Sequence, residues 1–355
     1  MTPLIIGKKT ISLTHAPFII AEAGINHNGS IETAFKMIDA AIEAGVDAVK
    51  FQTFTAKEFC SDSTQLFTYQ SQGKEITEPM LDMFERMELS EQEWRQLKAY
   101  CDTKNILFLS TPQNPSDLAL LLDIGIDAIK IGSDDFTNLP LISHYAKTGL
   151  PIILSCGMAD LGEVYQALST LGALKDDAYP CVLCLCTSQY PTPPQDINLK
   201  KLKTLAAAFP NLHLGFSDHS QGPLASSLAV TFGARVFEKH FTLDNDLAGP
   251  DHWFSENPQS LKQWVEHIHS AFTMLGSEKV EPTEKEKSMR VLARRSIVAL
   301  KDISAGETLN ENSIGLRRPG DGLPPAYYAE ILGKKASRDI PAFNCLNFGD
   351  FTNDE

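Results

Sequence analysis

Eight short runs of apolar and β-branched residues recur along the chain, and this repeat constrains the fold more than any other sequence feature. Each of the first seven runs is followed by a stretch whose apolar residues are spaced three and four apart, which predicts an amphipathic helix. Eight repeats of strand and helix over about 250 residues are typical of a (β/α)₈ TIM barrel. The runs are FIIAE at 18–22, DAVKFQ at 47–52, ILFLST at 106–111, DAIKIGS at 127–133, PIILSCG at 151–157, CVLCLCTS at 181–188, LHLGFSD at 212–218 and RVFEKHF at 235–241.

A doubly wound parallel sheet is the competing architecture, but no G-x-G-x-x-G motif follows the first predicted strand and the number of repeats favours the barrel. We therefore predict a barrel domain over residues 1–275. The polar stretch GSEKVEPTEKEKSMR then predicts a linker over 276–290. From 291 to 355, short strand-like pieces alternate with turn-rich clusters, which predicts a small, mostly β or irregular domain.

One connection, from Thr53 to Ser90, is longer than a barrel of this kind requires. Long connections in compact domains tend to be functional. Because this one follows a strand, it should lie on the catalytic face of the barrel. Our hypothesis is that it forms a lid over the substrates.

The charge balance excludes two classes of partner. The formal net charge is −14, and no block of basic residues interrupts it. Nucleic acid and anionic membranes are bound by concentrated basic surfaces, so we expect neither as a partner. Counter-charges for an anionic substrate would have to be local, from a few lysines, an arginine or a bound cation.

The cysteines and the start of the chain indicate a cytoplasmic protein. The seven cysteines are an odd number scattered through apolar segments, which fits reduced thiols better than disulfides. Cys181, Cys184 and Cys186 lie within the run CVLCLC, where a buried strand explains them better than a zinc site. We find neither an apolar run of signal-peptide length at the start nor 18 consecutive apolar residues elsewhere.

The predicted strand ends are unusually polar. Active sites of TIM barrels are built at the carboxyl ends of the strands, where all eight runs here place donors, acceptors or charges. Such convergence predicts a small, highly polar substrate, because buried polar groups of the protein need polar partners. The residues concerned are Glu22, Lys50, Gln52, Ser110, Thr111, Lys130, Ser133, Asp134, Asp135, Ser155, Thr187, Ser188, Tyr190, Ser217, Asp218, His219, Glu238, Lys239 and His240.

His219 and His240 follow the seventh and eighth predicted strands, which are neighbours in a closed barrel. A single histidine there would most simply be a satisfied core residue. Two at adjacent strand ends favour a shared divalent cation, with open positions for water and substrate oxygens. We expect Mn²⁺ or Mg²⁺, with other divalent ions as alternatives.

Lys50 and Lys130 lie within predicted buried strands, where an unpaired ammonium group is costly. They could bind phosphate and carboxylate groups, or one of them could be a Schiff-base nucleophile, and the sequence leaves both interpretations open. Lys239 is a weaker candidate, because strand alternation could direct it away from the site.

At this level of detail the chain resembles the sialic acid synthase family. The motifs AEAGINHNGS, VKFQTF, STP, IKIGSDD, CTSQYPTP, GFSDHS, EKHFT, GPDH and RRPGDG occur in the family's order over essentially the whole chain. The C-terminal part resembles the family's antifreeze-like domain. The resemblance implies condensation of phosphoenolpyruvate with N-acetylmannosamine or a 2,4-diacetamido sugar, giving a nine-carbon keto sugar acid and phosphate.

The resemblance also implies a role for each matching residue. Glu22 matches the acid near a metal-bound water, Lys50 and Lys130 match lysines that hold phosphoenolpyruvate, and His219 and His240 match the metal ligands. Thr111 and Ser133 match phosphate contacts, and Asp251 of GPDH matches a contact to the acceptor sugar. Further substrate contacts are implied for Gln52, Ser188, Tyr190 and Ser217. Arg318 of RRPGDG matches an arginine that reaches the barrel of a partner subunit, which implies a domain-swapped homodimer.

Three positions differ from the pattern common among users of N-acetylmannosamine. Asp134-Asp135 stands where Gly-Glu is common, Leu185 stands where a histidine is common, and Trp253-Phe254 replaces smaller or basic residues. The first and third differences lie where the sugar should bind, so Asp135 is included among the predicted sugar contacts. A bulkier aromatic and a shorter acid suit a sugar with a second acetamido group and a deoxy carbon.

Two other functions remain as alternatives. A Schiff-base aldolase would share the barrel and a keto-acid product, and borohydride trapping would distinguish it. A non-catalytic carbohydrate-binding protein is the alternative from another class. The intact set of polar strand ends favours an enzyme over it.

Overall fold

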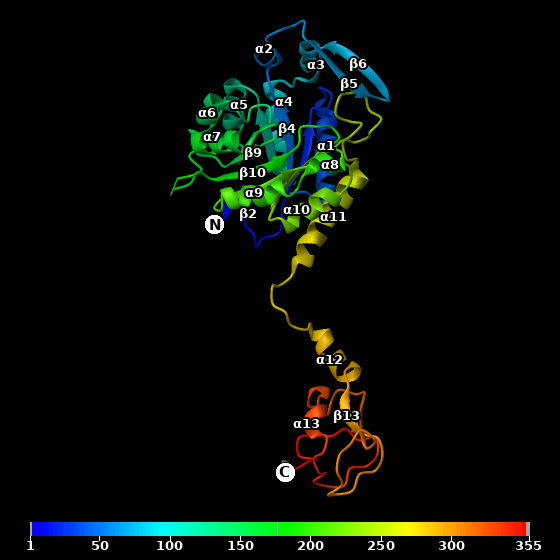
Figure 1. The fold of residues 1–355 in the computed structure, drawn as a ribbon. Coiled ribbons are helices and arrows are strands. Elements are labelled where there is room, and N and C mark those ends of the chain that lie inside the picture. The colour runs from blue at the N-terminus through cyan, green and yellow to red at the C-terminus, as the bar shows by residue number, and fades with distance from the viewer. Residues whose placement is uncertain (1, 176, 353–355) are drawn as a thin grey trace. The chain divides into compact units, whose positions relative to one another are not determined.

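The computed structural model describes residues 2–175 and 177–352. The chain divides into two compact units, with the boundary between Gly276 and Ser277. In the first unit eight parallel strands close into a barrel, which confirms the predicted TIM fold (Figure 1). These strands are β3 (Phe18–Gly24), β4 (Ala48–Thr53), β7 (Leu107–Pro112), β8 (Ile129–Ile131), β9 (Ile152–Ser155), β10 (Cys181–Cys186), β11 (His213–Ser217) and β12 (Val236–His240).

The strands follow one another around the barrel in chain order, and β12 pairs with β3 to close it. In the β10–β11 pair, Cys186 lies opposite Ser217, so the carboxyl ends of neighbouring strands meet at one mouth. Helices surround the barrel, and several end in a left-handed residue such as Gly45 or Gly125. The surrounding helices are α1 (Ile31–Ala44), α4 (Glu91–Lys104), α5 (Pro115–Ile124), α6 (Leu139–Ala146), α7 (Leu161–Leu171), α8 (Pro194–Ile197), α9 (Lys201–Ala208), α10 (Leu224–Thr231) and α11 (Pro258–Leu275).

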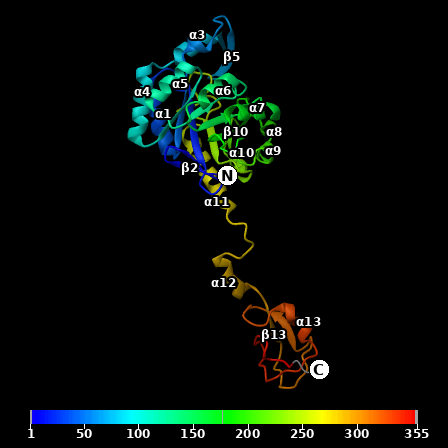
Figure 2. The ribbon, with the colours of Figure 1, turned by 90° about the vertical axis from the view of Figure 1, so that its left-hand side faces the viewer.

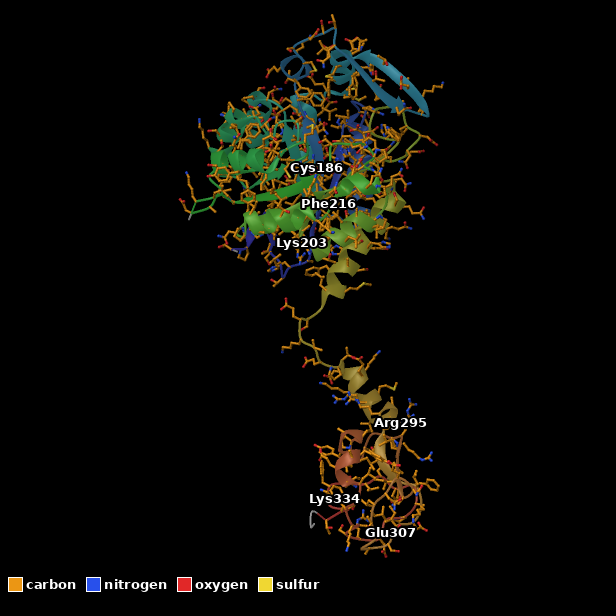
Figure 3. All side chains as sticks on the ribbon, viewed as in Figure 1. Cys186, Lys203, Phe216, Arg295, Glu307 and Lys334 are labelled. Carbon is orange, nitrogen blue, oxygen red and sulfur yellow. The ribbon has the colours of Figure 1, made fainter. Side chains whose placement is uncertain are left out.

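Two layers of apolar side chains stabilise the barrel. The larger lies between strands and helices and includes Phe51, Trp94 and Trp264. Cys181 belongs to this layer, whereas Cys184 belongs to the smaller layer that includes Ile20 and Val236. The buried strand predicted for CVLCLC is therefore confirmed, with side chains that alternate between the two layers. Figure 3 shows Cys186 and Phe216 within the densely packed barrel unit.

A hairpin not expected from the sequence precedes the barrel. Strands β1 (Leu4–Ile6) and β2 (Lys9–Ile11) pair in an antiparallel manner. Leu4, Ile6 and Ile11 are buried against the amino-terminal halves of the barrel strands. The end of the barrel opposite the mouth is thereby covered by apolar side chains.

The long connection after β4 is structured. It contains α2 (Ala56–Phe59), the antiparallel strands β5 (Leu66–Ser71) and β6 (Lys74–Pro79), and α3 (Met80–Met87). The two-residue turn Gln72-Gly73 has positive φ at both positions, as the favoured hairpin turns require. Figures 1 and 2 both show the hairpin and α3 at the end of the barrel away from β2.

The second unit has its own small core, built around Ile297, Ile314 and Leu346. Strands β13 (Ser296–Ala299) and β14 (Ile314–Arg317) pair in an antiparallel manner, and η1 (Pro325–Tyr327) leads into α13 (Tyr328–Ile331). Helix α12 (Glu284–Ala293) occupies the second half of the segment expected to be a linker, and a Thr283–Glu286 capping box begins it. None of the helices in the described part of the chain combines the length and apolarity that a membrane crossing requires.

Candidate active site

A cavity of about 650 Å³ opens at the carboxyl ends of the barrel strands. All eight strands contribute to its lining, as predicted for a TIM barrel site. The predicted site residues that line it are Glu22, Lys50, Gln52, Thr111, Lys130, Ser133, Ser188, Tyr190, Ser217, His219, His240 and Asp251. The sequence therefore identified 12 of the 28 residues that line the cavity.

Two lysines and two glutamates form a buried charged cluster on the cavity floor. Lys50 Nζ lies 2.6 Å from Glu22 Oε2 and 3.9 Å from Glu238 Oε2. Lys130 Nζ lies 3.5 Å from Glu238 Oε1. All four side chains are almost completely buried, so each ammonium group is balanced by a carboxylate.

Uncharged donors and acceptors complete this cluster. Lys50 donates to Thr111 Oγ1 at 3.1 Å, and Lys130 donates to Ser155 Oγ at 2.9 Å. Gln52 Nε2 donates to Glu22 Oε1 at 3.1 Å. Ser217 Oγ donates to Glu238 Oε1 at 3.2 Å. The floor is thus a preorganised set of donors around two fixed positive charges.

Burial and neighbouring charges shift the ionisation of these groups in opposite directions. Burial raises the pKa of Glu22, with Glu238 adding to the rise and Lys50 opposing it. Burial also works against ionisation of Glu238, but Lys130 and Lys50 outweigh it and lower its pKa. Burial pulls the pKa of Lys130 down, yet Glu238, two nearby cysteines and Glu22 together outweigh burial, so the pKa is raised and the amine stays protonated. Two carboxylates in one cavity therefore have different proton affinities, which suits one for proton transfer and the other for charge balance.

His219 and His240 lie side by side in the cavity, with ring centroids 5.5 Å apart. His219 Nδ1 donates to the Thr187 carbonyl oxygen at 2.8 Å. Burial works against the charged ring of His219, but Cys186 and the Thr187 carbonyl oxygen outweigh it and raise its pKa, so a bound cation would displace a proton from Nε2. His240 Nδ1 is buried without a hydrogen-bond partner. Burial, His219 and the nearby lysines hold the pKa of His240 well below its ordinary value, so its imidazole is neutral.

These two imidazoles fit a divalent cation. A neutral ring and a partner carbonyl that fixes the tautomer are typical of histidine ligands. Within residues 2–175 and 177–352, no group of three or more His, Cys, Asp or Glu side chains is arranged to hold a metal ion. The remaining coordination positions would therefore fall to water and substrate oxygens.

Asp251 lies next to the histidines, with Oδ2 3.7 Å from His240 Nδ1. Burial and the charge of Glu22 raise the pKa of Asp251 to about 7. The ring of Tyr190 is tilted against two others, with centroid distances of 4.2 Å to His219 and 5.2 Å to Phe254. An acid and an aromatic surface thus flank the histidine pair.

The hydroxyls of Ser133 and Ser188, two predicted substrate contacts, both lie close to the backbone of Gly157. A Cβ atom on Gly157 would lie 2.4 Å from Ser188 Oγ and 2.6 Å from Ser133 Oγ. Only glycine lets these hydroxyls approach the backbone so closely. Asp135 is placed differently from the other predicted contacts, because it accepts from Asn138 Nδ2 at 2.9 Å and does not line the cavity. Its neighbour Asp134 lines the cavity instead.

The β5–β6 hairpin forms one wall of the cavity through residues that include Phe67, Tyr69 and Glu75. It is attached to the loop that follows β12. Gly249 N donates to Ser71 Oγ at 3.0 Å, and Gln72 Nε2 donates to the Asp246 carbonyl oxygen at 2.8 Å. The hairpin thus lies where a substrate-covering element would be, while its movement stays a prediction.

Arg318 belongs to the second compact unit, where it is exposed after β14. Its predicted contact with a partner subunit's barrel stays a prediction.

Glu238 was counted among the polar strand ends but given no role, although it precedes His240 by two residues and strand alternation directs both to the same side. The sequence around the hairpin residues Phe67 and Tyr69 showed no strand pattern as clear as that of β12, so they were not predicted as cavity residues.

Comparisons with known proteins agree with this geometry. Residues 37–280 match the model of the NeuB family, and residues 294–342 match that of the SAF domain. The chain is 39% identical to the N,N'-diacetyllegionaminic acid synthase of Legionella pneumophila, covering 93% of each chain. It is 37% identical to a pseudaminic acid synthase of Campylobacter jejuni, covering 94% of this chain and 96% of that protein.

The fold has a counterpart of similar sequence among solved structures. The N-acetylneuraminic acid synthetase of Leptospira borgpetersenii, solved in complex with citrate, superposes with a TM-score of 0.72 at 33% identity. The match covers 81% of this chain and 95% of that one. The similarity therefore extends over most of both chains.

Proposed function

Because the chain belongs to the NeuB family, we propose that it condenses phosphoenolpyruvate with the aldehyde carbon of an N-acylated amino sugar and releases phosphate. The product would be a sialic-acid-type nonulosonic acid. The relatives named above are synthases of such acids. The proposal extends that chemistry to this chain's cavity.

The observation that carries the proposal is the charged floor beside the histidine pair. Lys50 and Lys130 present two ammonium groups a few residues from strand ends, each held by hydroxyl and carboxylate neighbours. Phosphoenolpyruvate carries a phosphate and a carboxylate, and two fixed cations with Ser and Thr donors suit such a polyanion. This arrangement would position the enol carbon toward His219 and His240.

His219 and His240 would hold a divalent cation, with Mn²⁺ as first choice and Mg²⁺ as the alternative, which would supply Lewis acidity toward the aldehyde oxygen. Lys50 and Lys130 hold the phosphate and carboxylate in place while the new carbon–carbon bond forms. Glu22, oriented by Gln52, accepts a proton from the water that adds to the pyruvyl carbon. The bond between that carbon and the phosphate oxygen then breaks, and phosphate leaves with the hydroxyl proton of that carbon, which becomes the ketone. The aldehyde oxygen, an alkoxide once the carbon–carbon bond has formed, takes up the proton held by Glu22.

For the acceptor we favour a 2,4-diacetamido-2,4,6-trideoxymannose over N-acetylmannosamine. The cavity lining also includes Trp253, Phe254 and the hairpin residues Phe67 and Tyr69. Aromatic faces pack well against an acetamido methyl group and a deoxy carbon. Ser188, Asp251 and Asp134 would supply the polar contacts.

Location and assembly belong to the same proposal. Seven free cysteines, five of them buried, suit a reducing cytoplasm. A homodimer in which Arg318 of one subunit completes the partner's mouth would fit the exposure of that side chain.

The test is a side-by-side assay of purified protein with Mn²⁺ and phosphoenolpyruvate, offering each sugar and measuring phosphate. We expect phosphate release that depends on sugar, is abolished by a chelator and returns with Mn²⁺. Full activity in excess chelator would contradict the proposal. A borohydride-trapped adduct of pyruvate would instead favour the aldolase, although a protonated Lys130 is a poor nucleophile.

A further inference from the structure

A second buried charged cluster lies behind the two histidines, outside the cavity lining. Lys239 Nζ lies 3.1 Å from Asp218 Oδ2 and 3.6 Å from Glu256 Oε1. It also donates to the carbonyl oxygens of Ser220 and Gly222. None of these groups is used by the proposed reaction. We call Lys239, Asp218 and Glu256 the rear cluster.

The rear cluster is fully paired, and its bonds converge on the residues beside His219. Asp218 Oδ1 accepts from Ser220 N at 2.8 Å and from Ser220 Oγ at 2.6 Å. Asp218 N donates to the Glu238 carbonyl oxygen at 2.8 Å. The backbone after His219 is therefore fixed by the Asp218 carboxylate, which Lys239 neutralises, and the backbone before it is fixed by a main-chain bond to β12.

The same cluster reaches His240. Lys239 directly precedes His240 in β12, and Glu256 N donates to the His240 carbonyl oxygen at 2.9 Å. Glu256 Oε1 accepts from Gly222 N at 3.2 Å, which links the loop after β11 to the loop after β12. One buried ammonium group thus bridges the two segments that present the histidines.

Helices anchor the cluster from outside. Asp218 Oδ2 accepts from Ser226 Oγ of α10 at 2.6 Å, and Trp264 Nε1 of α11 donates to Ser226 Oγ at 2.9 Å. The cluster is therefore attached to the rigid outer layer of the barrel. Loss of the central charge would leave two carboxylates buried close together, and the loops would have to separate to hydrate them.

We propose that Lys239, Asp218 and Glu256 are positioning residues that hold His219 and His240 at the separation a shared divalent cation requires. This inference rests on the proposed metal site. Partners that orient metal-binding histidines commonly change metal affinity about 10- to 100-fold when removed. Lys239 thereby gains a role different from the cavity-facing one considered for it in the sequence.

The experiment measures binding of Mn²⁺ alone to the full-length protein, from the electron paramagnetic resonance signal of the free ion, at a temperature where each variant is folded. We expect Lys239→Met and Glu256→Gln to weaken Mn²⁺ binding about tenfold or more. The second variant is isosteric and keeps an acceptor for Gly222 N, so it guards against a Lys239→Met protein that does not fold. Neither side chain lines the cavity.

Asp117→Asn is the matched control. Asp117 is a buried carboxylate that accepts from Asn114 N at 2.9 Å in the loop after β7, away from the histidines. It should change thermal stability while Mn²⁺ affinity stays at the wild-type value. Unchanged affinity in both rear-cluster variants, beside a wild type that binds, would overturn the positioning role alone. A wild type that binds no Mn²⁺ would overturn the metal site and the positioning role together.

Discussion

The two ends of the barrel are built from the same eight strands but from opposite kinds of residue. At the amino-terminal end, Ile6 and Ile11 of the β1–β2 hairpin pack against Ile20 and Val236 in a closed apolar layer. At the carboxyl end, lysines, carboxylates, hydroxyls and two imidazoles surround a cavity. A few residues along each strand separate the two environments.

This difference divides stability from function within one element. Burial of apolar side chains at the closed end stabilises the fold, and these side chains take no part in the proposed reaction. Buried charges at the mouth gain little net stability, because desolvation offsets their attraction. We therefore expect substitutions at the closed end to change unfolding without changing activity, and the loss of one buried charge at the mouth to change both.

The largest effect should come from His240→Ala at the mouth. With the proposed metal site incomplete, turnover should fall about a thousandfold, while the midpoint of thermal unfolding changes by only about 3 °C. Phosphate release and calorimetry would measure the two quantities. A variant that simply unfolds would place His240 among the structural residues and remove the contrast between the ends.

Lys130→Met tests whether the mouth is held by balanced charge. It leaves Glu238 without its nearer cation, so the free energy of unfolding should fall by about 4 kcal/mol. Adding Glu238→Gln should restore much of that stability without restoring activity. Denaturant unfolding of the single and double variants measures this, and a double variant as unstable as the single one would contradict it.

Ile11→Ala tests the closed end. Ile11 is only 1% exposed, so its truncation should cost about 3 kcal/mol of unfolding free energy. Activity per folded molecule should not change. Ile5→Ala is the control from the same hairpin, since Ile5 is 61% exposed and should tolerate the change. A loss of kcat/KM in Ile11→Ala would show that the two ends are coupled.

The smallest effect concerns pH. Burial, with His252 nearby, lowers the pKa of His27 to about 4 from an ordinary value near 6.5. The folded state therefore prefers the neutral ring, so its contribution is complete above about pH 6.5 and is lost as the pH falls toward 4. Between pH 8 and pH 5 this should cost about 2 kcal/mol.

Urea unfolding at several pH values would measure this loss. His27→Gln should flatten the dependence in that range, because the group that must take up a proton is gone. An equally steep dependence in the variant would assign the loss to other groups.

Sequence reasoning reached the barrel because each strand is a dense apolar run with a helix after it. The family resemblance drawn from nine ordered motifs was likewise confirmed by the comparisons. Half of the residues that line the cavity followed from one rule, that strand ends meet at a mouth. The alternation of side chains along a strand would also have placed Glu238 in the cavity, because it lies on the same side of β12 as His240.

Other elements gave too little signal. Strands β1 and β2 are three residues each, too short for a period to be recognised. The β5–β6 hairpin is largely exposed and polar, so its pattern resembles an irregular loop. Helix α12 buries none of its residues, and a helix without an apolar face is hard to distinguish from a charged linker. Which of Asp134 and Asp135 faces the cavity depends on local backbone geometry that composition does not encode.

The attachment of the hairpin to the loop after β12 has a consequence for how this site could diversify. The side chains of Ser71 and Gln72 form hydrogen bonds with main-chain atoms of that loop, at Gly249 and Asp246. These two hydrogen bonds do not depend on the side chains of the loop after β12, so those side chains can change while the loop stays attached to the β5–β6 hairpin. Evolution from this chain could therefore replace one aromatic residue of the loop with another and accept a sugar with different substituents, without a change in the fold.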